Sequence, residues 1–410
     1  MNEEQGRLGQ KRYGGIFYEE FLRELQGKRG VRVYQEMSEN DDVIGAILFA
    51  IKMLIRQTKW SVQPVGNEKN DLKAAEFVES CLHDMQSTWT DTVSEILSFL
   101  TYGWSIHEIV YKRRMGLKKD PRLDSKYDDG LIGWQKLPIR SQESLYQWVY
   151  DEHDNLTAFE QMPAPKFNVI RIPIDKCLLF RTESRKDIPE GRSILRNAYQ
   201  AWFYKKRIQE IEGIGIERDL AGFPVLIAPE GCDIWAESNA RLLEMCKEFV
   251  SNIRRDAMEG IPLPHGWELK LLSTGGSRQF DTNEVINRYN QGIARTVLAD
   301  FIFLGSGTTG SWALSSDKTE LFSMAIGAYL DIISETFNRK AIPALIELNR
   351  KSLGKLTGYP ELKHGDIEVA EYDKLAPFLK DLITAGVLTP DESLEDYIRA
   401  TYSLPPRVEE

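Results

Sequence analysis

The segment PEGRSILRNAYQAWFYKKRIQEIEGIGIERD, residues 189–219, predicts a long helix. It opens on Pro-Glu, and its helical pattern continues to Asp219. Gly213 and Gly215 weaken the last turns by about 1 kcal/mol each relative to alanine. This helix divides the chain into a first part of mixed helices and strands and a later part in which helices dominate.

The residues after this helix predict a small insertion followed by a returning helix. GFPVLIAPEG (222–231) and HGWELKLLS (265–273) have the composition of short strands, and an amphipathic helical pattern separates them over 238–260. Helical spacing of apolar residues then returns over 282–303. The expected order is therefore helix, small insertion, helix.

Residues 30–185, before the long helix, predict a single α+β domain. Helical spacing of apolar residues begins after Asn40, which can cap that helix. Two further helices and several short strands follow, and Gly103 is placed to end the third helix. The charged stretch KRRMGLKKDPRLDSKYDDG (112–130) lacks any periodicity and predicts a solvated loop.

The segment FLGSGTTGSWALSSDKTELF (303–322) contains the G-x-G-x-x-G spacing of a dinucleotide-binding turn at Gly305, Gly307 and Gly310. Such a turn follows a strand and opens a helix inside a βαβ unit. Here the preceding segment has a helical pattern, no strand pattern follows soon after, and no Gly-Lys-Ser/Thr completes a P-loop. The glycines are therefore interpreted as a flexible loop between two helices.

The helix after this loop is expected to run on for many turns. Ser315 or Ser316 can cap it, and Pro343 interrupts it. From about Val369 the sequence predicts two short helices at the end of the chain.

The composition disfavours a tight nucleic-acid binder and a membrane protein. Asp and Glu number 62 against 52 Lys and Arg, a net charge of −10, whereas the grip on a nucleic-acid backbone comes from Lys and Arg that displace counterions. The four cysteines form no C-x-x-C pair, no secretory signal is visible, and no segment approaches the roughly 18 apolar residues that span a bilayer. A soluble protein of a cytoplasm, with reduced thiols, is expected.

No motif indicates an enzyme, a cofactor or a metal centre. His107-Glu108 begins the zinc motif H-E-x-x-H, but Tyr111 stands where the second ligand is needed. Aspartates between 124 and 129 match a calcium loop only loosely. Basic clusters occur at 112–114, 205–207 and 254–255. Such runs are typical of solvated faces or of helix C-termini, although each could also contact phosphate.

The order of these elements resembles the portal proteins of tailed bacteriophages, and among them the Mu-like branch. The matching segments are YQEMSENDDVIGAILFAIKMLIRQTKWSVQP (34–64), FLTYGWSIHEIVYK (99–112), GRSILRNAYQAWFYKK (191–206), and INRYNQGIARTVLADFIFLG through ALSSDKTELF (286–322). The resemblance extends over most of the chain, from about residue 30 to about residue 400. Each segment is a pattern match rather than a catalytic signature, so the resemblance depends on all the segments taken together.

The resemblance implies an α+β portal-like fold made of a wing, stem helices, a small α/β clip and a short helical crown. The implied division is wing 1–190, first stem helix 191–218, clip 219–281, second stem helix 282–303, tunnel loop 304–315, long helix and return to the wing 316–368, and crown 369–410. It further implies a ring, usually of twelve copies, at one capsid vertex in the virion, with the chain in the host cytoplasm before assembly.

The resemblance also implies partners and site residues. Double-stranded DNA would pass non-specifically through the ring during packaging and ejection, and the large terminase, the major capsid or scaffolding protein and neck or adaptor proteins would bind it. No cofactor, metal, catalytic residue or membrane is implied. Candidates for the channel are Gly305, Ser306, Gly307, Thr308, Thr309, Gly310, Ser311, Trp312 and Lys318. Candidates for motor docking on the clip are Phe223, Arg254, Arg255 and Trp267.

Two other functions stay open at this point. One is a different phage structural protein, such as a baseplate or minor head component, which the helix–insertion–helix order disfavours. The other is an enzyme that binds a nucleotide at Gly305, Gly307 and Gly310. Nucleotide-dependent thermal stabilisation would distinguish the enzyme from a structural ring.

Overall fold

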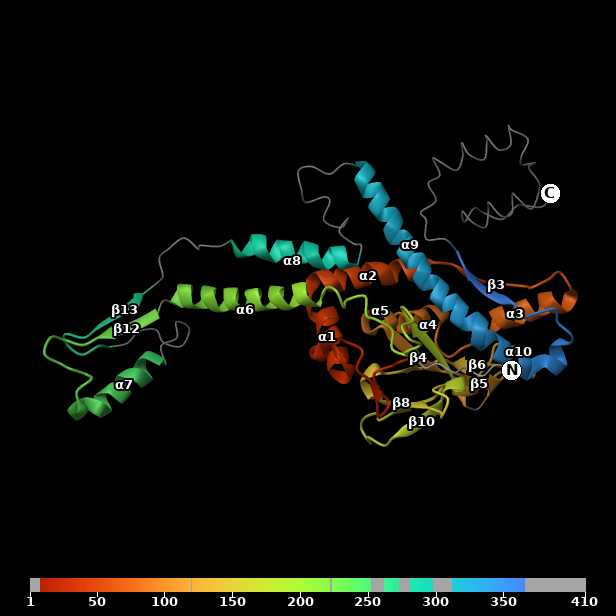
Figure 1. Ribbon diagram of the computed structural model, residues 1–410, viewed down its shortest axis with the longest axis horizontal. Helices are drawn as coiled ribbons and strands as arrows, with labels where there is room; N and C mark the ends of the chain where they lie inside the picture. The colour runs from red at the N-terminus through yellow and green to blue at the C-terminus, as the bar shows by residue number, and fades with distance from the viewer. Residues whose placement is uncertain are drawn as a thin grey trace. The chain divides into compact units, whose positions relative to one another are not determined.

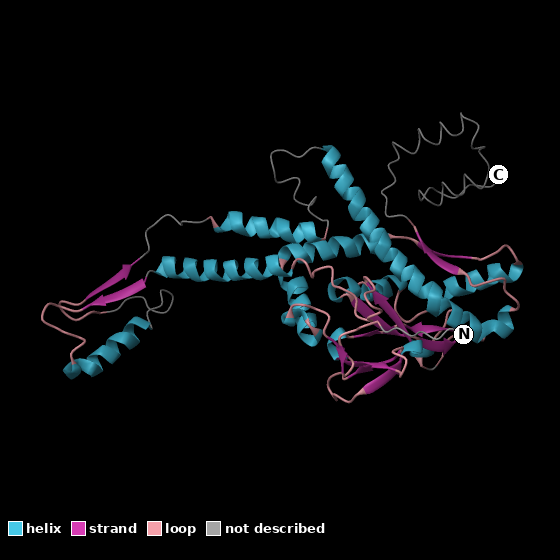
Figure 2. Cartoon of the chain, in the orientation of Figure 1, coloured by secondary structure: helices cyan, strands magenta, loops and turns pink. Residues whose placement is uncertain are grey.

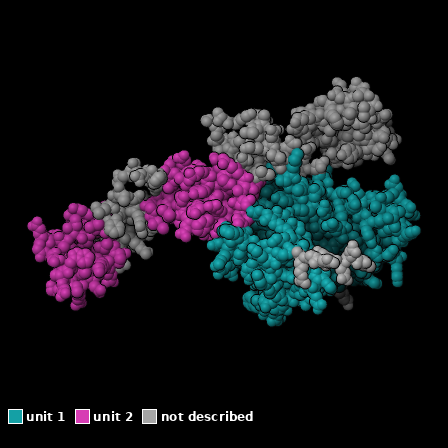
Figure 3. Space-filling model, in the orientation of Figure 1, with its two compact units in different colours: residues 1–35, 46–194, 308–410 teal, residues 36–45, 195–307 magenta. Residues whose placement is uncertain are grey.

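The computed structural model describes residues 8–118, 120–221, 223–251, 262–272, 281–297 and 312–365. For 217–221, 223 and 312–321 the backbone alone is described. The chain divides into two compact units, coloured teal and magenta in Figure 3. The first comprises residues 1–35, 46–194 and 308–410, and the second comprises 36–45 and 195–307.

The first unit has strands and helices interspersed (Figure 2), which agrees with the predicted α+β fold class. Its bounds differ from the predicted 30–185, because it also includes 308–410 and leaves out 36–45. Its helices, two of which reach into the second unit, are α1 (Gly27–Asn40), α2 (Asp42–Gln57), α3 (Lys69–His83), α4 (Trp89–Ile96), α5 (Ser98–Tyr102), α9 (Trp312–Thr336) and α10 (Ile342–Leu353). Its strands are β1 (Arg12–Tyr13), β2 (Ile16–Phe17), β3 (Trp60–Gln63), β4 (Trp104–Glu108), β5 (Val110–Arg113), β6 (Ile132–Lys136), β7 (Ile139–Arg140), β8 (Leu145–Tyr150), β9 (Leu156–Gln161), β10 (Ile170–Pro173), β11 (Cys177–Arg181) and β14 (Glu361–His364).

The strands pair antiparallel in small sheets. Two sheets have three strands, in the orders β11-β4-β7 and β10-β9-β8, and the pairs β5-β6 and β3-β14 are separate. Residues 151–155 join β8 to β9, which pair as an antiparallel hairpin. In the pair β3-β14, Val62 lies opposite Leu362, so the chain returns to this unit after the later helices.

Aromatic side chains fill the core between these sheets. The Trp104 and Trp148 rings meet edge to face with centroids 5.2 Å apart, and Phe159 packs 5.3 Å from Trp148. All three are buried. Such edge-to-face pairs add to the stabilisation that burial of the rings already provides. These contacts tie β4 to β8 and β9, so the two three-stranded sheets share one core.

His107 is buried inside this core on β4. Its Nδ1–H donates to the Leu137 carbonyl at 2.9 Å, while its Nε2 has no partner among the described residues. Burial lowers the pKa of His107 from 6.5 to about 4. The imidazole is therefore neutral in the fold, and it is a buried side chain of β4.

We expect His107 to make the stability of this unit fall with acidification. Because its folded pKa lies below the unfolded one, its contribution is complete above pH 6.5 and is lost as the pH falls from 6.5 to about 4. The loss is on the order of 3 kcal/mol. Urea unfolding at pH 7 and pH 4.5 should give a smaller pH difference for His107→Leu than for the wild type. Equal differences in the two proteins would contradict this role.

The start of α2 differs from the sequence prediction. Asn40 ends α1, and Asp41 caps α2, because its Oδ1 accepts from the backbone N–H groups of Val43 and Ile44 at 3.1 and 3.0 Å. The prediction that Asn40 caps the helix was therefore wrong. Asp41 lies between two helices, so its backbone departs from helical geometry. Its carboxylate accepts from backbone N–H groups at the start of α2 that have no partner within the helix.

The long helix begins later than predicted, at Tyr199 rather than at Pro189. Residues 189–198 instead pack as turns against the end of α5, where Gly103 has φ +89° as expected of a helix terminator. A Cβ on Gly191 would lie 2.2 Å from the Gly103 carbonyl oxygen, so only glycine allows this close approach. The Ser193 hydroxyl donates to the Thr101 carbonyl at 2.5 Å. These tertiary contacts override the local helical pattern.

One prediction about α9 was also wrong. The helix α9 starts at Trp312, so Ser315 and Ser316 lie inside it and neither caps it.

The predicted interruption of the helix near Pro343 is confirmed. A π-helical turn, Phe337–Ala341, separates α9 from α10, and Pro343 stands in the first turn of α10. Because proline has no N–H to donate to the preceding turn, the widened π-helical turn accommodates it.

Candidate functional site

The second unit contains a hairpin of two long helices, α6 (Tyr199–Ala221) and α8 (Thr282–Thr296), which are green and teal in Figure 1. Gly292 lies against Ala201, the Tyr204 and Tyr289 rings stack with centroids 6.3 Å apart, and the Thr282 hydroxyl donates to the Glu212 carboxylate. Along these contacts the residue numbers of α6 rise while those of α8 fall, so the two helices are antiparallel. This confirms the expected outgoing and returning helices, although α8 ends at Thr296 and not at 303.

The insertion between these helices is a small α/β element. The strands β12 (Phe223–Ile227) and β13 (Glu268–Leu272) pair antiparallel, with Phe223 opposite Leu272 and Ile227 opposite Glu268. The helix α7 (Ala240–Ser251) stands between them in the chain. Trp235, Met245 and Leu271 are exposed. The element therefore presents large apolar side chains to solvent at the far end of the hairpin.

A buried lysine anchors α6 to the start of α2 within the second unit. The Lys205 ammonium lies 2.9 Å from Asp41 Oδ2 and 2.6 Å from Asp42 Oδ1, and the Lys205 side chain is 2% exposed. The hydrogen bond from Lys205 holds the pKa of Asp42 below its usual value. Asp41 uses its other oxygen as the helix cap, so one carboxylate joins both helices.

In the basic cluster 205–207, Lys205 and Lys206 are thus paired with carboxylates. Lys206 pairs with Glu36, and the Arg207 guanidinium lies 5.4 Å from the centroid of the Phe203 ring. The interpretation of this run as a solvated face was wrong for Lys205, because an ammonium group can be buried where carboxylates compensate it.

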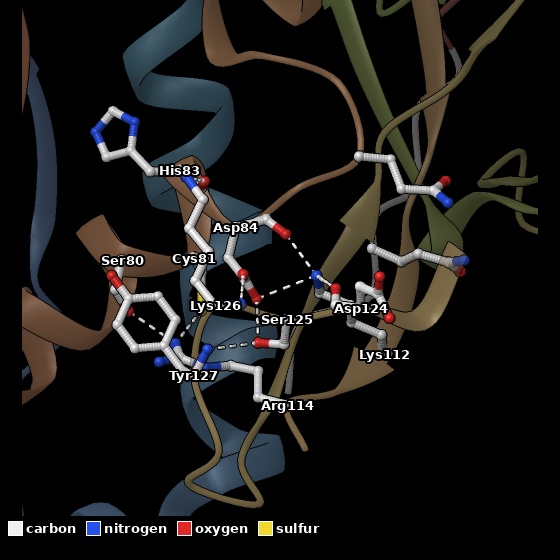
Figure 4. Close-up of polar contacts among 12 residues, drawn as sticks. Ser80, Cys81, His83, Asp84, Lys112, Arg114, Asp124, Ser125, Lys126 and Tyr127 are labelled. Carbon is white, nitrogen blue, oxygen red and sulfur yellow. Dashed lines mark hydrogen bonds and ion pairs between the residues drawn. The ribbon is translucent and has the colours of Figure 1, made fainter. Parts of the chain in front are cut away.

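A second buried charge cluster lies in the first unit, where β5 and the following loop meet the end of α3 (Figure 4). The Lys112 ammonium lies 3.1 Å from Asp84 Oδ2 and donates to the carbonyls of Asp84 and Asp124. The other Asp84 contacts come from the Ser125 hydroxyl and the Lys126 N–H, both at 2.7 Å. Both charged side chains are 2–3% exposed.

Arg114 is buried beside this cluster. It pairs with Asp129 at 2.8 Å, donates to the Ser80 hydroxyl at 2.7 Å, and stacks its guanidinium over the Tyr127 ring at 3.9 Å (Figure 4). The prediction that 112–130 is only a solvated loop was therefore wrong. Its inner side is fixed by ion pairs, whereas Met115, Leu117 and Leu123 are exposed.

Most predicted site residues of the channel lie outside the described residues. These are Gly305, Ser306, Gly307, Thr308, Thr309, Gly310 and Ser311. Trp312 and Lys318 belong to α9. The described elements nearest to the glycine loop are α8, which ends at Thr296, and α9, which begins at Trp312.

The structure describes two of the docking candidates of the insertion, Phe223 and Trp267. Phe223 begins β12, and the half-buried Trp267 precedes β13, with its N–H donating to the Pro264 carbonyl at 3.1 Å. Arg254 and Arg255 lie outside the described residues. Phe223 pairs with Leu272 and Ile227 with Glu268, so Phe223 and Trp267 lie at opposite ends of this strand pair.

Within the described ranges no three His, Cys, Asp or Glu side chains gather as a metal-binding group. No helix there combines the length and the apolar character needed to cross a bilayer. All four cysteines are free thiols.

Sequence reasoning missed the two buried lysines. Lys205 and Asp42 are 163 positions apart, and Lys112 is 28 positions from Asp84. No helical or strand periodicity relates such positions. The one local signal is the pair Asp41-Asp42 at a helix start. The helix dipole favours carboxylates at that position, so the pair alone does not indicate a buried lysine partner.

Comparisons with solved structures support the fold. The chain matches a chain in the virion of a native gene transfer agent particle with a TM-score of 0.52 at 13% identity, covering 92% of this chain and 94% of that one. A chain in the neck of a native particle of this kind, computed with C12 symmetry, matches with a TM-score of 0.51 at 12% identity over the same shares. At such identities these matches concern the fold alone.

Comparison with protein families extends the assignment beyond the fold. The family model described as the portal protein of Mu bacteriophage matches residues 31–404, which is most of the chain and includes both helices of the hairpin and its insertion. This protein therefore belongs to the Mu portal protein family.

Proposed function

We propose that this chain assembles into a closed ring, usually of twelve copies, which forms the channel at one vertex of a phage capsid. The observation that carries the proposal is the family match over residues 31–404. The antiparallel hairpin of α6 and α8, with a strand-paired insertion at its end, supports it. The ring would belong to the virion, and single chains would occupy the host cytoplasm before assembly.

In this proposal double-stranded DNA passes through the ring during packaging and ejection. The glycine loop, expected over 304–315, would line the narrow part of the channel, and its small uncharged residues would bind phosphate weakly. Trp312 and Lys318 extend the candidate set into the first turns of α9. The net charge of −10 fits this role, because every Lys–phosphate contact must be broken for the DNA to advance.

The insertion is proposed to bind the large terminase first and neck or adaptor proteins later. Its exposed Trp235 and Met245 suit a docking surface, since aromatic residues and methionine are enriched at such interfaces. Phe223, Arg254, Arg255 and Trp267 remain the docking candidates. The first unit would form the wing, which contacts the major capsid or scaffolding protein, and residues from 369 would form the crown.

Assembly of heads with a shortened chain tests this proposal. In the variant, α6 is joined to α8 by a short Gly-Ser linker in place of 222–281. Capsids that incorporate the variant are expected to contain no DNA, because the motor lacks its docking surface. Wild-type chain in the same preparation is the control. DNA-filled heads made with the variant would contradict the proposed role of the insertion.

The two competing functions have less support. A nucleotide-binding enzyme predicts a rise in thermal stability with ATP or NAD, and we expect none because the sequence pattern before the glycine turn is that of a helix. A baseplate or minor head protein does not require the helical hairpin with its insertion.

A further inference from the structure

A small cavity opens in the first unit where the end of α2, the strand β3 and the helices α3 and α4 meet. Its volume is about 120 Å³, comparable with cavities that accept a benzene-sized group. Trp60 and Trp89 line it, with their rings edge to face and the centroids 5.5 Å apart. Arg56, Glu79 and His83 line it as well. The cavity therefore combines an aromatic wall with polar groups and has room for one side chain.

Two charged side chains line the cavity without an ion pair. The Arg56 guanidinium is exposed and the Glu79 carboxylate is half-buried. Neither has an ion-pair partner among the residues that the structure describes. Ionised groups form the stronger hydrogen bonds when a partner of opposite charge is near. Arg56 can therefore bind a carboxylate, and Glu79 would oppose that carboxylate at the same cavity.

The other charges around the cavity favour a carboxylate only slightly. Trp89 and Thr90 are the first two residues of α4, so the positive end of that helix dipole lies at the cavity. His83, which also lines it, is exposed. Lys59 and Asp91, each next in sequence to a lining residue, add one charge of each sign. The charges nearly balance, so the course of the chain has to identify the occupant.

The described part of the chain ends beside this cavity. In the pair β3-β14, His364 lies opposite Trp60, and the centroids of the two rings are 5.8 Å apart. The Gly365 N–H donates to the Lys59 carbonyl at 2.9 Å, so the antiparallel pairing continues one position beyond β14. One further step in this register lies opposite Thr58, which lines the cavity.

The residue at that further step is Asp366. Alternate side chains of a strand point to the same face. In this register an aspartate there shares the face of His364, whose ring contacts Trp60 at the cavity. The sequence that it opens, DIEVAEYD (366–373), has four acidic residues and no basic one. The chain therefore continues past the cavity with the charge that pairs with Arg56.

We propose that the Asp366 carboxylate enters this cavity and pairs with Arg56, so that the cavity anchors the C-terminal segment to the first unit. A group attached at the edge of a cavity is present there at a high effective concentration, which favours it over a carboxylate from another molecule. The anchor would directly precede the segment predicted as the crown, 369–410. The contact lies within one copy of the chain and does not depend on the proposed ring.

Hydrogen exchange of the backbone over 366–372, followed by mass spectrometry, tests the anchor. The sequence of this segment is the same in the wild type and in every cavity variant, so any difference comes from the cavity. Arg56→Gln removes the cation and should make the segment exchange about tenfold faster. Glu79→Gln removes the opposing carboxylate and should make it exchange more slowly. Arg29→Gln changes an exposed arginine of α1 that does not line the cavity, and should have no effect.

The opposite effects of the two cavity variants give the decisive result. Asp366→Asn should speed exchange as much as Arg56→Gln does, and the double variant should add nothing, because both changes remove one contact. Equal exchange in the wild type, Arg56→Gln and Glu79→Gln would overturn the anchor. Exchange of the wild-type segment at the rate of an unstructured peptide would overturn it as well.

Discussion

Replacing Lys112 with methionine is expected to destabilise the first unit by about 3–5 kcal/mol. The substitution keeps the length of the side chain but leaves the Asp84 carboxylate buried without its ammonium partner. It also leaves the carbonyls of Asp84 and Asp124 without the donor that they share. Urea unfolding followed by tryptophan fluorescence measures the loss, because Trp104, Trp134 and Trp148 are buried in the same unit.

A control and a second variant show whether the buried pair causes this loss. Lys136→Met changes an exposed lysine on β6 and should shift the stability by less than about 1 kcal/mol. Adding Asp84→Asn to Lys112→Met should recover part of the stability, because no charge then remains buried. A Lys112→Met protein as stable as the control would contradict this role.

Replacing Lys205 with methionine is the second large effect, again about 3–5 kcal/mol. The Asp41 side chain is 4% exposed and would lose its cation. Asp42 is 79% exposed and can recover hydration, so most of the loss comes from Asp41. Limited proteolysis of the second unit, read together with urea unfolding, measures the change.

The neighbouring Lys206 provides the matched control on the same helix. Its pair with Glu36 lies at the surface, where both side chains are at least 40% exposed, and such pairs contribute about 0–1 kcal/mol. Lys206→Met should therefore have a small effect. Equal losses for Lys205→Met and Lys206→Met would mean that burial does not distinguish the two ion pairs.

The order of helices and strands was predictable from the sequence because local patterns carry it. The apolar spacing that begins after Asn40 predicts α2 correctly. The start of α6 was not predictable, because the Gly103–Gly191 contact that excludes helix from 189–198 joins residues far apart in sequence. The same holds for the pairing of β3 with β14.

The candidate site was predictable only as an order of elements. The helical hairpin and its strand pair follow from periodicity, whereas the burial of Lys205 and Lys112 depends on carboxylates that other elements bring close. Runs of basic residues look alike in sequence whether they are solvated or buried. A buried lysine differs from a solvated one in having a buried carboxylate beside it, and the fold alone determines which lysines have such a neighbour.

Imaging of the purified chain by negative-stain electron microscopy, with native mass spectrometry alongside, shows whether the chain forms a ring. We expect closed rings with a central opening, and a mass that is a whole multiple of 47.0 kDa and fixes the subunit number. A compact monomer at every concentration, stabilised by an added nucleotide, would rule out the portal ring and return the glycine loop to an enzymatic role.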